Sequence, residues 1–340
     1  MSHDASSMRV LLPSRIQPPD LPAGAVVASF SGACMGTGWS VRCVSEDSLL
    51  SARARQEVPA LLEQLEAQMS HFREHSDLRR FGRHAAGEWM QLPPAFASVM
   101  RAALEVAQAS EGAFDPALGA EVDAWGFGSA RHFSDPAFSP PAEGRRPPRA
   151  AWSALRLDEA GRLFQPGDVQ LNLSAIAKGF AVDAVSALLS RLGLHNHLVE
   201  VGGELRGAGM KPDFQPWWVA LELPARDCPL PATRIALHGL AVATSGDYRR
   251  RYHHDGRALQ HTLDPATGAP LTHGTASVTV LHEQCMLADA WATALMVRGP
   301  DAGLTLAEEH KLCALIQWRN NKDEWVEAAS SAFTALQQSS

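Results

Sequence analysis

The sequence has few cysteines and none of the spacings that cysteine-based sites need. Five cysteines occur in 340 residues, and no two of them form a Cys-x-x-Cys pair. An odd number at irregular spacing indicates free thiols in a reducing compartment instead of a disulfide framework. The zinc motif His-Glu-x-x-His is also missing, because His282-Glu283 lacks the second histidine. Disulfide-stapled folds and zinc chemistry are therefore not expected.

Excess positive charge and long apolar runs are absent as well. The net charge is −7, which argues against a nucleic acid as partner. The short basic runs Arg145-Arg146 and Arg249-Arg250-Arg251 are expected on the solvated surface. No stretch reaches the roughly 20 apolar residues that cross a bilayer. A membrane span is therefore not expected.

No export signal is visible near the start of the chain. The first twenty residues contain Asp4, two arginines and three prolines, without a continuous apolar segment. Ser31-Gly32-Ala33-Cys34 resembles a lipoprotein cleavage site, but the stretch before it is short and has no basic end. We therefore expect a cytoplasmic protein, or a periplasmic one if a signal has been removed.

The glycine motif of dinucleotide dehydrogenases is missing too. Gly203, Gly207 and Gly209 do not have the Gly-x-Gly-x-x-Gly spacing, and Pro212 stands where the following helix should run. This segment is predicted to be a hairpin.

The composition that remains, 46% apolar and 20% charged residues, is that of a large folded protein. Residues 1–23 are polar, contain several prolines, and are expected to form a flexible arm. Residues 24–330 are predicted to form one domain, with a Pro- and Arg-rich excursion at 131–150 that could divide it into two lobes. Residues 331–340 are expected to be a C-terminal tail.

Helices and strands are predicted in groups. Two short strands are expected on either side of a turn at Gly36-Thr37-Gly38. The predicted helices cover 52–69, 94–109, 176–192 and 286–297. The first two have apolar residues at helical spacing, the third is followed by Gly193 as a C-terminal cap, and the last begins with an alanine-rich stretch. Groups of helices between runs of antiparallel strands favour an α+β fold over a doubly wound sheet.

The segment Ala288–Thr293 contains the most informative pair of side chains. Asp289 and Thr293 are four residues apart in a predicted helix, so they lie on one helix face. A carboxylate and a hydroxyl are hard oxygen donors, which suit magnesium when phosphates complete the coordination. An aspartate early in a helix can also be a capping residue, and the threonine can be a packing residue.

With its companion motifs, this segment resembles the ApbE-like FAD:protein FMN transferases, a family of flavin transferases. The match runs from about Met35 to about Gly299, in the order of the family. The motifs that carry the resemblance are Met35–Thr37, Met69–Phe72, Gly112–Pro116, Trp125–Gly128, Ala175–Asp183, Val201–Glu204, Ala243–Tyr248, His261–Gly268 and Ala288–Thr293.

The resemblance implies an enzyme of the α+β ApbE-like fold, with mixed and antiparallel sheets and an FAD cleft between two lobes. Such an enzyme transfers FMN from FAD to a Thr or Ser hydroxyl of a target flavoprotein, forms a phosphoester, releases AMP and requires magnesium. The residues that match the metal ligands of the family are Asp289, Thr293 and the main-chain carbonyl of Ala175. By the same matching, Asp289 is also a catalytic residue.

Further positions match the FAD-binding residues of the family. Asn172 stands where many relatives have aspartate, so it brings an amide to FAD instead of a charge. Met35 and Phe72 could alternatively be core residues, and Lys178 a solvated helix charge. His261 is the candidate base and also contacts FAD, since histidine titrates near neutral pH. The full set of expected FAD contacts is Met35, Phe72, Ala113, Phe114, Asp115, Asn172, Lys178, Thr244, Ser245, Gly246 and His261.

Two other functions fit the same motifs. An FAD pyrophosphatase would use water in place of the protein hydroxyl and would release FMN and AMP. A non-catalytic FAD-binding protein would cleave nothing, but it would have no need for both Asp289 and Thr293.

Overall fold

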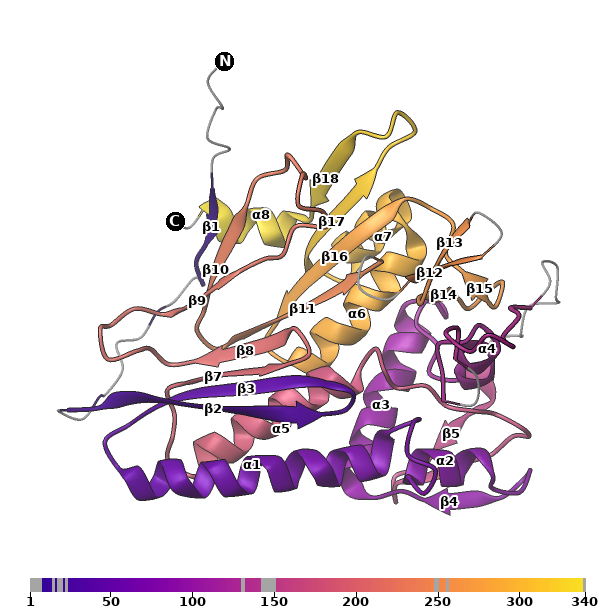
Figure 1. The fold of residues 1–340 in the computed structure, drawn as a ribbon, viewed down its shortest axis with the longest axis horizontal. Coiled ribbons are helices and arrows are strands. Elements are labelled where there is room, and N and C mark those ends of the chain that lie inside the picture. The colour runs from indigo at the N-terminus through magenta and orange to yellow at the C-terminus, as the bar shows by residue number, and fades with distance from the viewer. Residues whose placement is uncertain are drawn as a thin grey trace.

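The fold is built around one antiparallel sheet of eight strands (Figure 1). The computed structural model describes residues 8–13, 16, 21, 24–129, 132–141, 151–247, 251–254 and 257–338. All neighbouring strands of this sheet are antiparallel. In spatial order they are β18 (Trp325–Ala329), β17 (Cys313–Arg319), β16 (Thr275–His282), β11 (Leu240–Gly246), β8 (Glu204–Ala208), β7 (His197–Val201), β3 (Thr37–Ser45) and β2 (Val26–Cys34).

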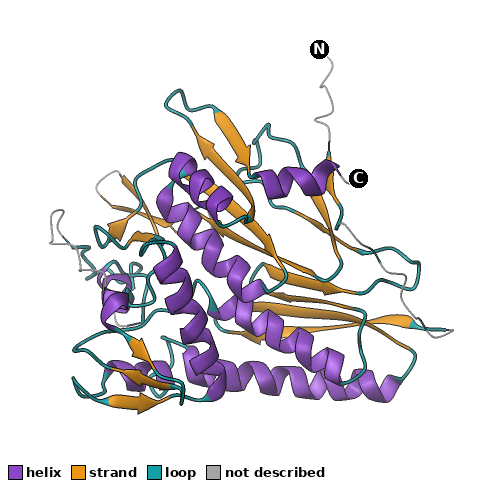
Figure 2. Ribbon diagram, turned by 180° about the vertical axis from the view of Figure 1, so that it is seen from behind, coloured by secondary structure: helices purple, strands orange, loops and turns teal. Residues whose placement is uncertain are grey.

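The long helices cover one face of this sheet, as Figure 2 shows from behind. Helix α6 packs on β11 and β16 and touches α5 beside it. Helix α1 then packs on α5, and α3 on α6. Their bounds are α1 (Ser48–Met69), α3 (Pro94–Ala109), α5 (Ala177–Arg191), α6 (Cys285–Arg298) and α7 (Pro300–Glu309). The four predicted long helices are all present, with ends that differ by up to four residues.

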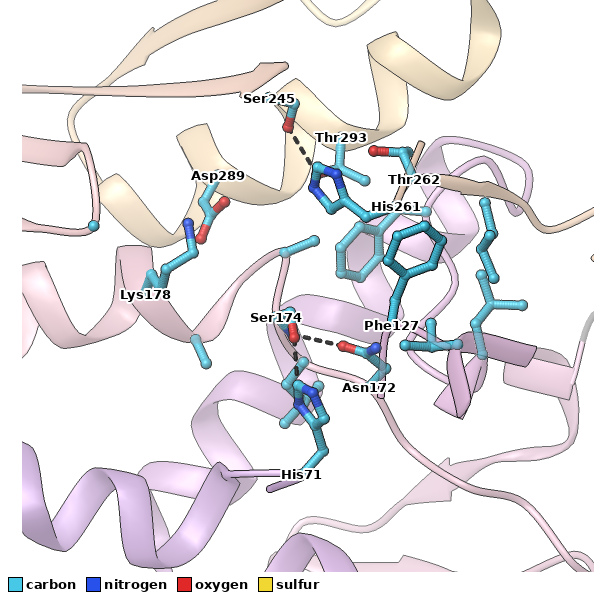
Figure 3. Close-up of a pocket in the computed structure, with 18 of the residues that line it drawn as sticks. His71, Phe127, Asn172, Ser174, Lys178, Ser245, His261, Thr262, Asp289 and Thr293 are labelled. Atoms are coloured by element: carbon cyan, nitrogen blue, oxygen red, sulfur yellow. Dashed lines mark hydrogen bonds between the residues drawn. The ribbon is translucent and has the colours of Figure 1, made fainter. Parts of the chain in front are cut away.

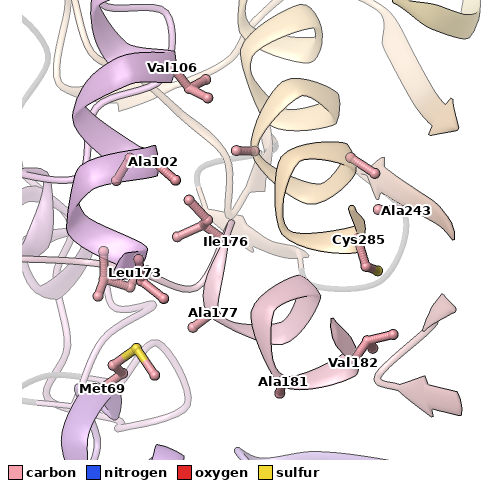
Figure 4. Close-up of a cluster of buried hydrophobic side chains, with 14 of the residues drawn as sticks. Met69, Ala102, Val106, Leu173, Ile176, Ala177, Ala181, Val182, Ala243 and Cys285 are labelled. Carbon is pink, nitrogen blue, oxygen red and sulfur yellow. The ribbon is translucent and has the colours of Figure 1, made fainter. Parts of the chain in front are cut away.

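The main core lies between these helices and the sheet. Figure 4 shows Met69, Ala102, Val106, Leu173 and Ile176 gathered where α1, α3 and the start of α5 meet. Helix α6 adds a series of buried alanines, and small side chains let its axis approach α5 and β11 closely. This close packing fixes the relative positions of α5 and α6.

A smaller core lies on the opposite face of the sheet. There β1 (Arg9–Leu11) pairs in parallel with β10 (Thr233–Leu237), which pairs with β9 (Trp217–Ala220). Helix α8 (Ser331–Gln338) adds Phe333, which is fully buried against this cluster. The interpretation of 331–340 as a tail was therefore wrong for its helical part, because Phe333 fills this core. The arm at 1–23 likewise contributes a strand.

The remaining elements form a second lobe beside the helices. It contains a sheet of three strands and an aromatic cluster around Phe127, Phe133 and Tyr252. Its elements are α2 (Asp77–Gly82), β4 (Trp89–Gln91), α4 (Gly119–Ala124), η1 (Ala151–Ala154), β5 (Arg156–Leu157), β6 (Arg162–Phe164), β12 (Arg251–His254), β13 (Arg257–Gln260), β14 (Leu263–Asp264) and β15 (Ala269–Pro270).

Some predictions fall outside the described residues. Half of the Pro- and Arg-rich excursion does so, including Arg145 and Arg146, and so do Tyr248, Arg249 and Arg250. Within the part of the chain that is described, no helix has both the length and the apolar character to cross a membrane.

The first hairpin turns earlier than predicted. Strands β2 and β3 pair up to Cys34 and Thr37, so the turn consists of Met35 and Gly36. Both have positive φ angles, 55° and 70°. This is the geometry of a two-residue hairpin turn that matches the twist of the strands. It holds Met35 at the end of β2.

Candidate active site

A cavity of about 330 Å³ lies between the two lobes (Figure 3). It is lined by residues from helices, strands and loops that are far apart in the sequence. Every site residue predicted from the sequence lines it, namely Met35, Phe72, Ala113, Phe114, Asp115, Asn172, Ala175, Lys178, Thr244, Ser245, Gly246, His261, Asp289 and Thr293.

The contact between α5 and α6 positions Asp289. A Cβ atom at Gly179 would lie 2.4 Å from the carbonyl oxygen of Cys285, so only glycine allows the two helices to come this close. The Gly179 N–H donates to Oδ2 of Asp289 over 3.1 Å. The Asp183 carboxylate accepts from the N–H groups of Cys285 and Met286, at 3.0 and 2.9 Å, and so caps α6.

Three charged groups meet at this contact. Lys178 forms an ion pair with Glu204, and the electrostatic field of Asp289 also acts on its ammonium group. Burial tends to lower the pKa of Lys178, but the two carboxylates together raise it above its usual value. Lys178 is therefore charged, and the interpretation of it as a solvated helix residue was wrong.

The two carboxylates of this cluster are strongly desolvated. Burial raises the pKa of Glu204 to about 7, against the opposing effect of Lys178. Burial also raises the pKa of Asp289, and Lys178 and the Gly179 N–H oppose that shift. Oε2 of Glu204 is buried and has no hydrogen-bond partner among the described residues. With both carboxylates ionised, the cluster of Lys178, Glu204 and Asp289 has one uncompensated negative charge.

A divalent cation fits this arrangement. Thr293 lies one helical turn beyond Asp289, and its hydroxyl is 3.0 Å from the Ser245 hydroxyl on β11. Ala175, just before α5, lines the same cavity. Among the described residues, no three His, Cys, Asp or Glu side chains form a metal cluster. The available donors suit an ion such as magnesium, which uses few protein ligands and fills the rest with phosphate and water.

The opposite end of the cavity is aromatic and polar. Phe72 is 49% exposed and its ring centroid lies 3.9 Å from that of His71. Phe72 is therefore not a core residue, whereas Met35 does pack partly against the main core. Oδ1 of Asn172 accepts from the Ser174 N–H over 2.9 Å, and the Ser174 hydroxyl lies 3.4 Å from Nδ1 of His71 (Figure 3).

The segment after α3 contributes a buried acid. Ala113 and Phe114 are buried, and Asp115 follows them into the cavity wall. Oδ1 of Asp115 accepts from the Ala117 N–H over 2.8 Å. Burial raises the pKa of Asp115 to about 6, so this carboxyl changes charge near neutral pH.

His261 follows β13 on the side of the cavity formed by the second lobe. Its ring packs edge-on against Phe127, with the centroids 6.3 Å apart. Thr262 and Pro265 of the following turn line the same wall. His261 and Thr293 thus line the same cavity.

Sequence reasoning missed one member of the charged cluster. Glu204 belongs to the motif Val201–Glu204, but the sequence suggested no role for it. An acid directly after two glycines at the start of a strand was the available signal. Other lining residues that were not predicted as site residues are Thr37, Met69, Ser70, His71, Leu118, Val122, Phe127, Leu173, Ser174, Ala177, Gly202, Thr262, Leu263, Pro265 and Val297.

Comparisons with known proteins identify the family of this chain. Residues 35–316 match the sequence profile described as the ApbE family. A curated protein of Vibrio cholerae named FAD:protein FMN transferase is 35% identical, over 89% of this chain and 91% of that protein. One of the same name from Haemophilus influenzae is 34% identical, over 91% of each chain.

Solved structures give the same result. The apo form of the Pseudomonas stutzeri flavinyl transferase ApbE is 35% identical and has a TM-score of 0.79, covering 92% of this chain and 97% of that one. The flavin transferase ApbE from Vibrio cholerae has a TM-score of 0.80 at 33% identity, covering 92% and 99%. By profile, sequence and fold, this chain belongs to the ApbE family.

Proposed function

We propose that this chain transfers FMN from FAD to a Thr or Ser hydroxyl of an acceptor protein, with magnesium bound at Asp289, Thr293 and the Ala175 carbonyl. The observation that carries the proposal is the buried Oε2 atom of Glu204, which has no hydrogen-bond partner among the described residues and lies with Lys178 and Asp289 at the cavity. A protein that only bound FAD would have no use for two buried carboxylates at its binding site. The names of the relatives support FAD as the donor and a protein as the acceptor.

The reaction needs few protein groups. The acceptor oxygen forms a bond to the FMN-side phosphorus while the bond from that phosphorus to the bridging oxygen breaks, and AMP leaves with the bond electrons. His261 takes the proton of the attacking hydroxyl. Lys178 holds positive charge at the Asp289 side of the cavity. When bound, magnesium would neutralise the charge that develops on the phosphate oxygens.

The flavin end of the cavity positions the donor. Phe72 and Met35 offer apolar surface to the ring system, and Asn172 offers an amide. Positioning of this kind makes a large contribution to phosphoryl transfer, because the transition state needs little covalent help from the protein.

The experiment that tests the proposal follows the fate of the flavin. The chain is incubated with FAD, magnesium and a candidate flavoprotein acceptor, and the acceptor is then denatured and separated. We expect flavin fluorescence on the acceptor and one AMP released for each flavin attached. An acceptor with its target Thr changed to Val is the matched control and should remain unlabelled.

Two results would contradict the proposal. Equal amounts of free FMN and AMP, with no labelled acceptor, would identify a pyrophosphatase that uses water. FAD that is bound but neither cleaved nor transferred would identify a non-catalytic binding protein.

A further inference from the structure

Strand β2 is the last strand on its side of the eight-stranded sheet (Figure 1). It pairs with β3 from Val26–Ser45 to Cys34–Thr37. In a two-residue hairpin the residues that flank the turn, here Cys34 and Thr37, form a hydrogen-bonded pair. Counting back from Cys34, every second residue of β2 therefore forms its main-chain hydrogen bonds with β3. In agreement, the Gly38 carbonyl on β3 bonds away from β2, to Gly202 over 2.9 Å.

The alternate residues of β2 therefore direct their main-chain groups away from the sheet. These are Val27, Ser29, Ser31 and Ala33. The carbonyl of Ser29 accepts a hydrogen bond of 2.9 Å from the Arg55 guanidinium. Within the described residues, the N–H and C=O groups of Ser31 and Ala33 have no partner, and both residues are exposed.

Proteins normally protect such an edge. Charged side chains, prolines and bulges are the usual devices, because an open edge recruits other strands. The nine residues of β2 include no charged residue and no proline, and the pairing with β3 contains no bulge. The unprotected part at Ser31 and Ala33 has only small, uncharged side chains.

The open edge leads directly to the active site. Met35 follows β2 and lines the cavity. A chain that pairs with Ser31 and Ala33 and continues past Cys34 would therefore reach Met35 in the cavity wall.

We propose that Ser31 and Ala33 of β2 bind an extended segment of the acceptor protein by main-chain hydrogen bonds. This strand addition brings the hydroxyl of the acceptor over the Met35–Gly36 turn into the cavity. The inference rests on the proposed transfer to a protein, since only a polypeptide acceptor needs such an edge. Main-chain bonds supply affinity, and the small side chains of Ser31 and Ala33 leave the acceptor strand room to lie flat.

The test removes one main-chain donor without changing the cavity. Ser31→Pro deletes an outward N–H, a change that edge strands tolerate. We expect the KM for the acceptor to rise on the order of tenfold, with the Kd for FAD within about twofold of wild type. Ser31→Ala keeps the N–H and should behave as wild type.

Val27→Pro is the matched control for damage to the strand. It removes an outward N–H from the same edge beyond Ser29, outside the proposed docking segment, and should leave the acceptor KM unchanged. An unchanged KM in Ser31→Pro would overturn the inference, and so would an equal rise in Val27→Pro.

Sedimentation of the wild type and of Ser31→Pro tests whether a second copy of this chain, and not the acceptor, occupies the edge of β2. If the chain forms a dimer that Ser31→Pro dissociates without changing the acceptor KM, the edge serves self-association and the inference is wrong. If the wild type labels no acceptor at all, the proposed function itself fails, and the docking role fails with it.

Discussion

Helix α5 takes part in two groups of buried polar side chains, and only one of them has all of its polar atoms paired. Near its middle, Ser186 donates to Nε2 of His197 over 2.8 Å, and Nδ1 of His197 donates to the Leu194 carbonyl over 2.7 Å. Both ring nitrogens of this fully buried histidine are paired. Near the start of α5, the cluster of Lys178, Glu204 and Asp289 includes a buried carboxylate oxygen, Oε2 of Glu204, that has no partner among the described residues.

This difference separates buried polar groups that only stabilise the fold from buried polar groups that serve a function. A buried polar group that is fully paired stabilises one packing arrangement and needs nothing further. A buried group that is left unpaired costs free energy, and a protein tolerates this where a ligand completes the site. His197 belongs to the first class and the charged cluster to the second, although α5 joins them.

The largest expected effect tests the functional cluster. Asp289→Asn keeps the shape of the side chain and removes the charge that would hold magnesium. FMN transfer should fall by about a thousandfold, because charge on the phosphate would no longer be neutralised. Glu105→Gln, which removes an exposed charge on α3, should have no effect. Full transfer by Asp289→Asn would show that the charge of Asp289 has no role in the reaction.

A second prediction concerns the structural pair and the pH dependence of stability. Burial lowers the pKa of His197 to about 4, so the folded protein keeps this ring neutral while the unfolded chain binds a proton below about 6.5. Its contribution to the unfolding free energy is fully present above pH 6.5. We expect it to decrease by about 3 kcal/mol as the pH falls to 4.

Denaturant titrations of the wild type and His197→Gln at several pH values measure this contribution. The difference between the two proteins should shrink as the pH falls from 6.5 to 4. His195→Gln, at an exposed neighbour, should keep the pH dependence of the wild type. A constant difference between wild type and His197→Gln would show that His197 does not titrate in this way.

The smallest expected effect concerns Glu204. Glu204→Gln removes one negative charge from the cluster without touching the predicted ligands. Binding of Mn²⁺, a spectroscopic substitute for magnesium, should weaken about tenfold. Glu105→Gln is again the control. Unchanged Mn²⁺ affinity would mean that Glu204 only balances the charge of Lys178.

Local patterns predicted much of the site. The spacing of Asp289 and Thr293 placed both on one helix face, and both line the cavity. The apolar spacing predicted α1 and α3, because each buries one face against the core. Helix α6 is buried on nearly all sides, and its apolar, alanine-rich sequence predicted it instead. The motif order then placed distant segments together at the cavity.

Tertiary contacts account for what the sequence did not predict. The pairing of Lys178 with Glu204 depends on how α5 crosses β8, and no local pattern encodes that crossing. Phe333 is buried in a core that Leu11 and Trp217 complete from elsewhere in the chain, so the local sequence around Phe333 did not indicate its role. The open edge of β2 likewise follows from strand order, since the same residues in a central strand would be paired.

Counting bound ions is the most direct test of a divalent cation at Asp289, Thr293 and the Ala175 carbonyl. Mn²⁺ is titrated by electron paramagnetic resonance into wild type, Asp289→Asn and His197→Gln, each with saturating FAD and no acceptor. We predict one Mn²⁺ per chain in the wild type and in His197→Gln, and none in Asp289→Asn over the same range. Equal binding by wild type and Asp289→Asn would contradict the account.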